Sequence, residues 1–200
     1  MQGLSLSRKL AGMNTAPTYL KHHFLIAMPH MADPNFAQTV TYLVEHNEQG
    51  AMGLVINRPS GLTLSDVLEQ LRADELPPAR CQGVTIYNGG PVQTDRGFVL
   101  HPAGQQFQAT LELGDLSLST SQDVLFAIAD GSGPQKSLIT LGYAGWEAGQ
   151  LEAELADNAW LTCPADPAVL FDVPHEQRLA AAAERLGINL ALLTAQAGHA

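Results

Sequence analysis

Two arginines beside glycine-rich turns are the side chains of this sequence best suited to bind a ligand. Arg58 follows the apolar run 53–57, and Arg96 lies between Asp95 and Gly97. A planar guanidinium donates paired hydrogen bonds to carboxylates and phosphates. In a chain with ten Lys+Arg against twenty Asp+Glu, two such isolated cations indicate an anion-binding site. The alternative is that each arginine pairs with a carboxylate of its own, for example Arg58 with Asp95.

Further candidates lie in turns at strand ends, where rigid sheets commonly present binding groups. Glycine lets the backbone approach a ligand closely, and tyrosine and tryptophan offer an amphipathic wall. The same residues also fit a structural interpretation, in which the glycines allow tight packing and Trp146 belongs to the core. The ligand-binding residues that we predict to line one surface cleft are Asn57, Arg58, Gly89, Gly90, Arg96, Tyr143 and Trp146.

A strand, a turn and a helix follow one another between residues 51 and 71. Thr63 and Asp66 match the capping-box pattern, and apolar residues recur at helical spacing from Leu64 to Leu71. Free amide groups at a helix start attract anions, so this order strengthens the expectation of an anion site. The segment 131–137 resembles a phosphate-binding loop, but it runs from helix to strand. We therefore predict a helix C-cap and turn there.

No catalytic or metal-binding motif is recognisable. The seven histidines lack metal-ligand spacing, and no G-x-S-x-G elbow is present. We therefore expect no metal and no cofactor, and we assign no catalytic residue. An enzyme that clamps an anionic metabolite between Arg58 and Arg96 remains an alternative. Cys81 and Cys163 are predicted to be unpaired thiols in a reducing compartment.

Composition limits the class of partner. The formal net charge is −10, with a pI of about 4.9. Nucleic-acid affinity depends on neutralising phosphates, and anionic lipid repels an acidic surface, so we expect neither a nucleic acid nor a membrane as partner. A small molecule or a protein is the expected partner, and the cytoplasm the expected location. The 200 residues predict a flexible lead-in over 1–18, one domain over 19–188 and a tail over 189–200.

Strands and helices alternate without a regular βαβ rhythm, which favours an α+β fold. Alternating or continuous apolar residues predict strands near 24–28, 39–45, 51–56, 84–87, 98–101 and 137–141. The segment 111–118 predicts a hairpin around Gly114-Asp115. Helices are predicted over 63–71, from 120 to Gly131, over 149–157 and over 175–186.

Several of these segments resemble the AlgH/YqgE family of bacterial proteins. They are Phe24 to Pro29, Gly50 to Pro59, Asn88 to Val92, Asp95 to His101, Leu141 to Trp146 and Gly149 to Leu155, followed by Asn158 and Trp160. The resemblance implies a bifurcated mixed sheet with a small closed barrel, surrounded by helices. It implies no established biochemical activity. It also implies a regulatory link to alginate production, and a transcriptional regulator is one form that this role could take.

Overall fold

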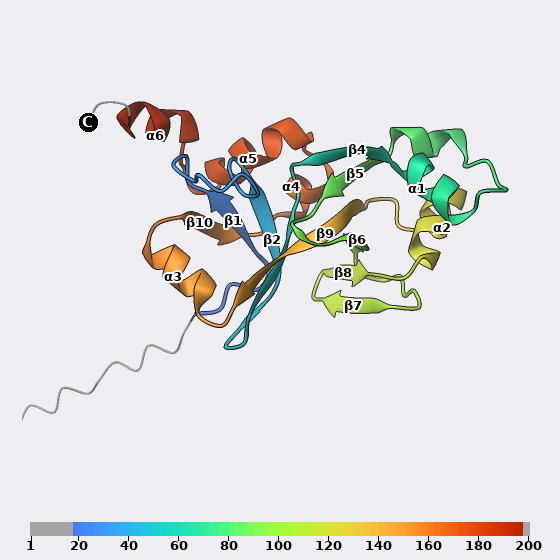
Figure 1. Cartoon of the computed structure of the whole chain (residues 1–200), viewed down its shortest axis with the longest axis horizontal. Helices are drawn as coiled ribbons and strands as arrows, with labels where there is room; N and C mark the ends of the chain where they lie inside the picture. Colours follow the sequence, from blue (N-terminus) through green and yellow to red (C-terminus); the bar gives the residue numbers. More distant parts are fainter. Residues whose placement is uncertain (1–17, 198–200) are drawn as a thin grey trace, which may run out of the picture.

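A long curled sheet organises the molecule, as the computed structural model of residues 18–197 shows (Figure 1). Of the expected lead-in over 1–18, only Thr18 lies within the described residues. The main path of the sheet is antiparallel throughout. Its order is β10 (Trp160–Pro164), β1 (His23–Ala27), β2 (Val40–Asn47), β3 (Gly50–Val55), β9 (Leu138–Glu147), β6 (Val92–Pro102), β8 (Leu116–Ser119) and β7 (Thr110–Leu113).

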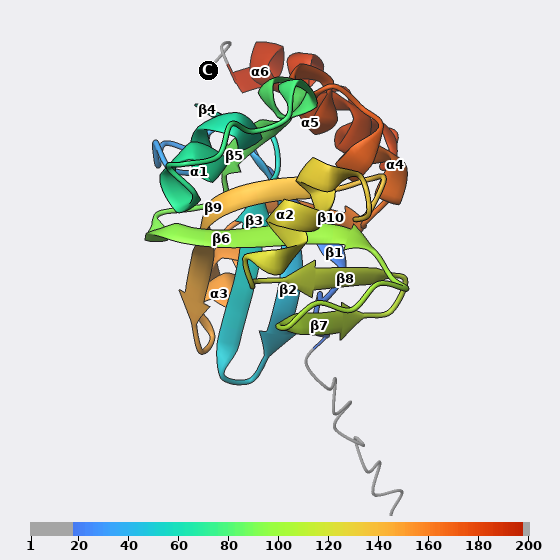
Figure 2. The same ribbon diagram turned by 90° about the vertical axis from the view of Figure 1, so that its right-hand side faces the viewer.

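The sheet curls so that its two ends face each other. Side chains of the β7–β8 hairpin, such as Leu116 and Leu118, share one apolar core with Phe24 and Tyr42 from β1 and β2. Figure 2 shows β6, β8 and β7 crossing in front of β2 and β3. Within residues 18–197, no pairing joins β7 to β10. The sheet is therefore an open half-barrel there, and the small closed barrel implied by the resemblance is not seen.

The sheet forks at β9. Over residues 139–141, β9 pairs in parallel with β5 (Thr85–Asn88), which also pairs with β4 (Pro59–Thr63). Farther along, residues 144–147 of the same strand pair antiparallel with β3. The crossing is tight, because a Cβ atom on Gly90 would lie 2.2 Å from the Tyr143 carbonyl and one on Gly89 would lie 2.3 Å from Gly142 O. Gly89 and Gly90 therefore serve close packing at the fork.

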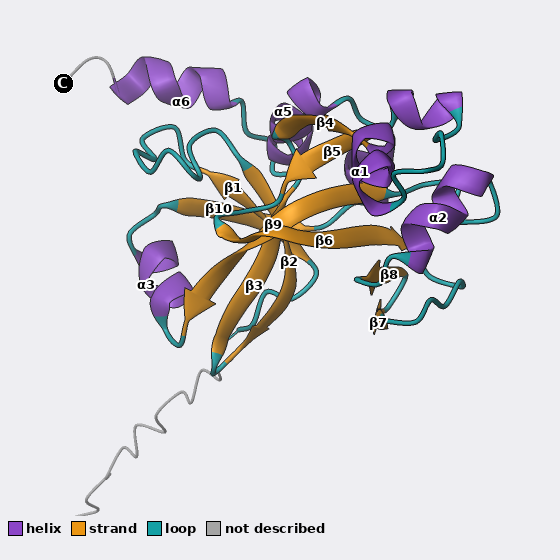
Figure 3. Ribbon diagram, turned by 45° about the vertical axis from the view of Figure 1, so that its right-hand side comes forward, coloured by secondary structure: helices purple, strands orange, loops and turns teal. Residues whose placement is uncertain are grey.

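Helices cover the outer side of the sheet (Figure 3). The helix α1 (Leu64–Leu71) has the predicted Thr63–Asp66 capping box, and α2 (Asp123–Asp130) ends at Gly131 with a φ of +86°. Both pack with the short helix η1 (Ala79–Gly83) on apolar residues of β5, β6 and β9. Farther along the same outer side, α3 (Gln150–Ala156) covers the two tryptophans. None of the helices within residues 18–197 has the length and apolar character needed to cross a bilayer.

Three C-terminal helices complete the described chain: α4 (Pro167–Phe171), α5 (His175–Glu184) and α6 (Leu190–Ala197). The sequence predicted α5 but neither α4 nor α6, and α6 occupies most of the expected tail over 189–200. Cys81 and Cys163 are buried and unpaired in the described structure, as predicted. Burial raises the pKa of both thiols.

Candidate functional site

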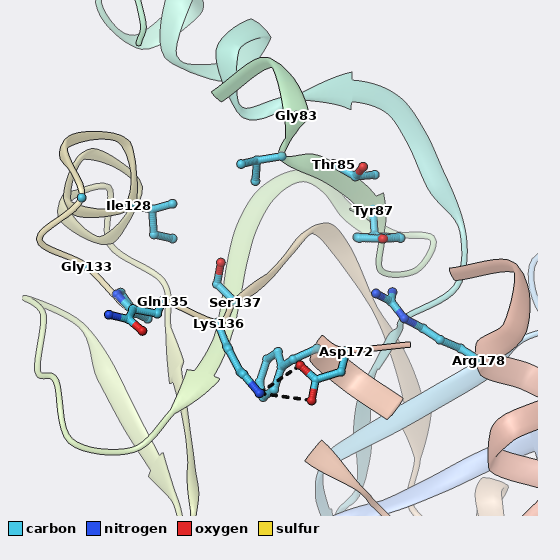
Figure 4. Close-up of a pocket in the computed structure, with 14 residues that line it drawn as sticks. Gly83, Thr85, Tyr87, Ile128, Gly133, Gln135, Lys136, Ser137, Asp172 and Arg178 are labelled. Carbon is cyan, nitrogen blue, oxygen red and sulfur yellow. Dashed lines mark hydrogen bonds and ion pairs between the residues drawn. The ribbon is translucent and has the colours of Figure 1, made fainter. Parts of the chain in front are cut away.

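A cavity of about 650 Å³ opens between η1 and β5 on one side and α4 and α5 on the other (Figure 4). The turn that follows α2 forms part of its rim. Its apolar contacts come from side chains such as Tyr87, Ile128 and Phe171, while Thr85 and Ser137 supply hydroxyl groups. Its charged groups are Lys136, Asp172 and Arg178.

Arg178 is the most unusual of these groups because it is a charged side chain that is only 6% exposed. Its Nε donates to Val173 O at 3.0 Å, its Nη1 donates to Ile56 O, and its guanidinium carbon lies 4.9 Å from the ring centroid of Tyr87. Within residues 18–197 it forms no ion pair with a carboxylate. The guanidinium points from α5 toward Tyr87 at the cavity edge (Figure 4). Carbonyl dipoles and an aromatic face stabilise this cation in place of a carboxylate, so no opposite full charge within the described residues balances it.

The second cation of the cavity is Lys136. Its Nζ lies 2.9 Å from Oδ1 and 3.1 Å from Oδ2 of Asp172, and both side chains are about half exposed. Two cations therefore line the cavity against one carboxylate, and they approach it from different sides (Figure 4). This arrangement suits an anionic group placed between Lys136 and Arg178, since charge-assisted hydrogen bonds are the strong ones.

The turn at the rim is closed by its own hydrogen bonds. Gly131 N and Gly133 N both donate to Ala127 O, at 3.1 and 2.9 Å, and Ser132 N donates to Asp130 Oδ1. The predicted helix C-cap and turn is confirmed. Because the amides of Gly131, Ser132 and Gly133 are already occupied, this part of the turn shapes the cavity without cradling a phosphate in the manner of a phosphate-binding loop.

Asn57 and Arg58 do not face this cavity or a ligand cleft. The Arg58 guanidinium donates to the carbonyl oxygens of Pro34, Asn35 and Ala37, each at 2.7 Å. Asn57 bonds to Val40 N and to Gln38 O, both at 3.0 Å. Both side chains thus fasten the β1–β2 loop. The proposed Arg58–Asp95 pair is wrong for the same reason: carbonyl oxygens, not a carboxylate, occupy the guanidinium.

The start of α1 is also occupied. Thr63 N donates to Asp66 Oδ2, and Leu64 N donates to Val84 O, both at 2.8 Å. Residues 59–63, expected to be a turn, form the strand β4. The amides that would have held an anion there are already bonded within the protein.

Tyr143 and Trp146 lie on opposite faces of the strand β9. Residues three apart in a strand point to opposite faces, so Tyr143 packs with the concave core while Trp146 packs under α3. Trp146 is only 6% exposed, and its Nε1 donates to Glu154 Oε2. Arg96 and Tyr143 do line one concavity together. The seven predicted residues therefore do not share one cleft.

Two histidines form pairs that resemble catalytic dyads, but both imidazoles are buried. His101 Nε2 lies 2.8 Å from Ser119 Oγ, and its Nδ1 donates to Pro102 O; His101 and Ser119 are fully buried. His46 contacts Glu152, while its Nδ1 accepts a hydrogen bond from Leu20 N. Within residues 18–197, no three His, Cys, Asp or Glu side chains are placed to hold a metal ion. The cavity of Lys136 and Arg178 offers groups for binding an anion, and no histidine or cysteine lines it.

Sequence reasoning missed Tyr87, Lys136 and Arg178. Lys136 lies in the segment 131–137, for which the sequence predicts a helix C-cap and turn and no binding site. Arg178 precedes Ala182 by four residues and thus shares the buried face of α5, a position where an arginine is unexpected. An arginine on the apolar face of a predicted helix was therefore the signal that could have identified Arg178.

The model of the AlgH-like family matches residues 24–191. This chain belongs to that family. It is 83% identical over 186 residues to the UPF0301 protein AlgH of Pseudomonas aeruginosa, covering 93% of this chain and 98% of that protein. A UPF0301 protein of Pseudomonas fluorescens is 75% identical over 187 residues, covering 94% and 99% of the two chains.

Solved structures show the same fold. The solution structure of the P. aeruginosa AlgH protein superposes with a TM-score of 0.78 at 83% identity, covering 93% of this chain and 98% of that one. A crystal structure of a Corynebacterium diphtheriae protein superposes with a TM-score of 0.67 at 20% identity, covering 90% and 94%. The second likeness concerns the fold alone.

Proposed function

We propose that this protein binds a small anionic ligand in the cavity of Lys136 and Arg178, and that it acts by binding without catalysing a reaction. The observation that carries the proposal is the buried guanidinium of Arg178, which has no carboxylate partner within residues 18–197 and lies at the cavity edge. Leaving a buried cation without a counter-charge is costly, and a bound anion offsets part of that cost.

The size and lining of the cavity support a metabolite-sized ligand. Ligand pockets commonly have volumes of about 300–1,000 Å³, and this one measures about 650 Å³. Tyr87 and Phe171 offer apolar contacts beside the cations. The anionic group of the ligand would replace Asp172 as the partner of Lys136 and would gain a contact with Arg178.

A regulatory role, located in the cytoplasm, is part of the same proposal. The family resemblance supports it through the suggested link to alginate production, and ligand occupancy would be the regulatory input. Direct binding to duplex DNA is excluded from the proposal, because the net charge of −10 opposes contacts with phosphates. A regulatory effect on transcription would then pass through a protein partner.

The test is a titration of the full chain with inorganic pyrophosphate and with citrate, followed by amide NMR shifts and by calorimetry. We expect shifts centred on residues 131–137 and 172–178. Lys136→Gln should weaken binding by about tenfold, the loss typical of one charge-assisted hydrogen bond. Lys21→Gln is the matched control, because Lys21 is also an exposed lysine paired with an acid, Glu45 at 3.4 Å. Equal affinities of the wild-type and Lys136→Gln proteins, or no shifts at millimolar ligand, would refute the proposal.

A further inference from the structure

The concave side of the curled sheet opens at one end into a second cavity, of about 670 Å³. We call this cavity the sheet mouth. Neighbouring strands of the sheet, from β2 through β3, β9, β6 and β8 to β7, each contribute a side chain. The large apolar residues of the sheet mouth are Val44, Met52, Tyr143, Phe98, Leu118 and Leu111, in that strand order.

The sheet mouth is open because β7 ends the path of strands. This strand has four residues, and Leu111 within it is 52% exposed. Deeper inside, Leu118 is buried, and the rings of Phe98 and Tyr143 meet edge to face with centroids 5.9 Å apart. The cavity thus has an apolar floor and an accessible rim, as in small barrels that bind ligands at their mouths.

Arg96 places a cation over this apolar floor. Its guanidinium carbon lies 5.2 Å from the ring centroid of Phe98, and its Nη1 donates to Gln93 Oε1 at 3.2 Å. Within residues 18–197 it forms no ion pair with a carboxylate. The remaining donors of the guanidinium are therefore available to a ligand that occupies the sheet mouth.

The acid of the sheet mouth, Glu45, is already neutralised. Its Oε2 lies 3.4 Å from Lys21 Nζ, and its Oε1 accepts a hydrogen bond from His46 N at 3.1 Å. The unbalanced charge of the sheet mouth is therefore positive, and its walls are apolar. A hydrophilic anion would leave the apolar walls wet, while a neutral hydrocarbon would make no use of the remaining donors of Arg96. An amphipathic anion satisfies both surfaces.

We infer that the sheet mouth is a second binding site, which takes an aliphatic carboxylate: its carboxylate bonds to Arg96 and its hydrocarbon chain packs on Met52, Phe98 and Tyr143. The hydrocarbon chain is better matched to the sheet mouth than to the cavity of Lys136 and Arg178, whose lining is more polar. The two sites thus differ in ligand class, and each can fail without the other.

Calorimetry and amide NMR with acetate, hexanoate, octanoate and octan-1-ol test this inference. Affinity should rise with chain length, by up to about fourfold for each methylene that leaves water. Octanoate should shift the amides of residues 52, 98, 111 and 143. Arg96→Gln should weaken octanoate by about tenfold while leaving octan-1-ol within about twofold, because only the anion uses the guanidinium.

Two further variants make the test specific. Arg72→Gln is the matched control, since Arg72 also lies over a phenylalanine ring, 3.7 Å from the Phe126 centroid, but outside the sheet mouth. It should bind octanoate as the wild type does. Leu111→Asp should weaken octanoate by adding a like charge at an exposed position. Equal octanoate binding by the wild-type and Arg96→Gln proteins, equal binding of acetate and octanoate, or shifts confined to residues 131–137 would each overturn the inference.

Discussion

Glu154 links both tryptophans of the chain to α3, and its removal should destabilise the fold strongly. Its Oε2 accepts hydrogen bonds from Trp146 Nε1 at 2.9 Å and from Trp160 Nε1 at 2.8 Å. The two indoles are 6% and 4% exposed, so loss of the carboxylate leaves two largely buried N–H donors without their acceptor. An unsatisfied buried donor costs about 1–3 kcal/mol. We therefore expect Glu154→Ala to lower the free energy of unfolding by about 2–5 kcal/mol. Glu154→Gln, which keeps a neutral acceptor, should lower it by about half as much.

Urea unfolding followed by circular dichroism measures this change, with the intrinsic fluorescence of the native state as a second observable. The chain has two tryptophans, and both donate to this one carboxylate, so their emission should change in the variants. Glu69→Ala is the control, because Glu69 is an exposed glutamate in α1 and should change the stability by less than about 0.5 kcal/mol. If Glu154→Ala were as stable as Glu69→Ala, or Glu154→Gln less stable than Glu154→Ala, the reasoning would be refuted.

Substitutions at Tyr42, Arg58 and Gly90 test the core, the β1–β2 loop and the fork. Burial raises the pKa of Tyr42 from 10.0 to about 12, so the folded state favours the neutral phenol. The contribution of this neutral phenol to the free energy of unfolding is complete below pH 10 and is lost as the pH rises toward 12. That difference corresponds to about 3 kcal/mol, and Tyr42→Phe should lack this alkaline loss in unfolding titrations. Arg58→Ala should cost about 1–3 kcal/mol in thermal unfolding, since three carbonyl oxygens lose their donor, and Arg58→Lys should restore part of it. Gly90→Ala should cost at least about 3 kcal/mol because its Cβ would lie 2.2 Å from the Tyr143 carbonyl, whereas Gly97→Ala, with open space around it, should be tolerated.

Local signals in the sequence predicted local structure well. The Thr63–Asp66 capping box begins α1, Gly131 ends α2, and Gly114-Asp115 turns the β7–β8 hairpin, because each depends on residues that are close in the chain. Strand β4 was missed because the segment 59–63 lacks apolar alternation, and only its pairing with β5 extends it.

The candidate site was less predictable because its contacts are distant in sequence. Arg58 was correctly singled out as unusual, but its partners are carbonyl oxygens more than twenty positions earlier, which no spacing rule indicates. Arg178 bonds to a carbonyl 122 positions earlier and lines a cavity that exists only when α5 lies against β5 and the turn after α2. The residue types that bind an anion could be recognised in the sequence, but their convergence could not.

The order of strands in the sheet also bears on how the chain folds during synthesis. The first strands to emerge from the ribosome, β1, β2 and β3, can form an antiparallel meander from neighbouring residues. Both outer edges of that meander are covered by strands made much later, β9 against β3 and β10 against β1. Exposed strand edges invite pairing with other chains, and folding that waits for distant contacts is slow. The nascent meander therefore stays open to aggregation until residues 138–164 have been synthesised, and a chain that stops short of them has no way to cover its own edges.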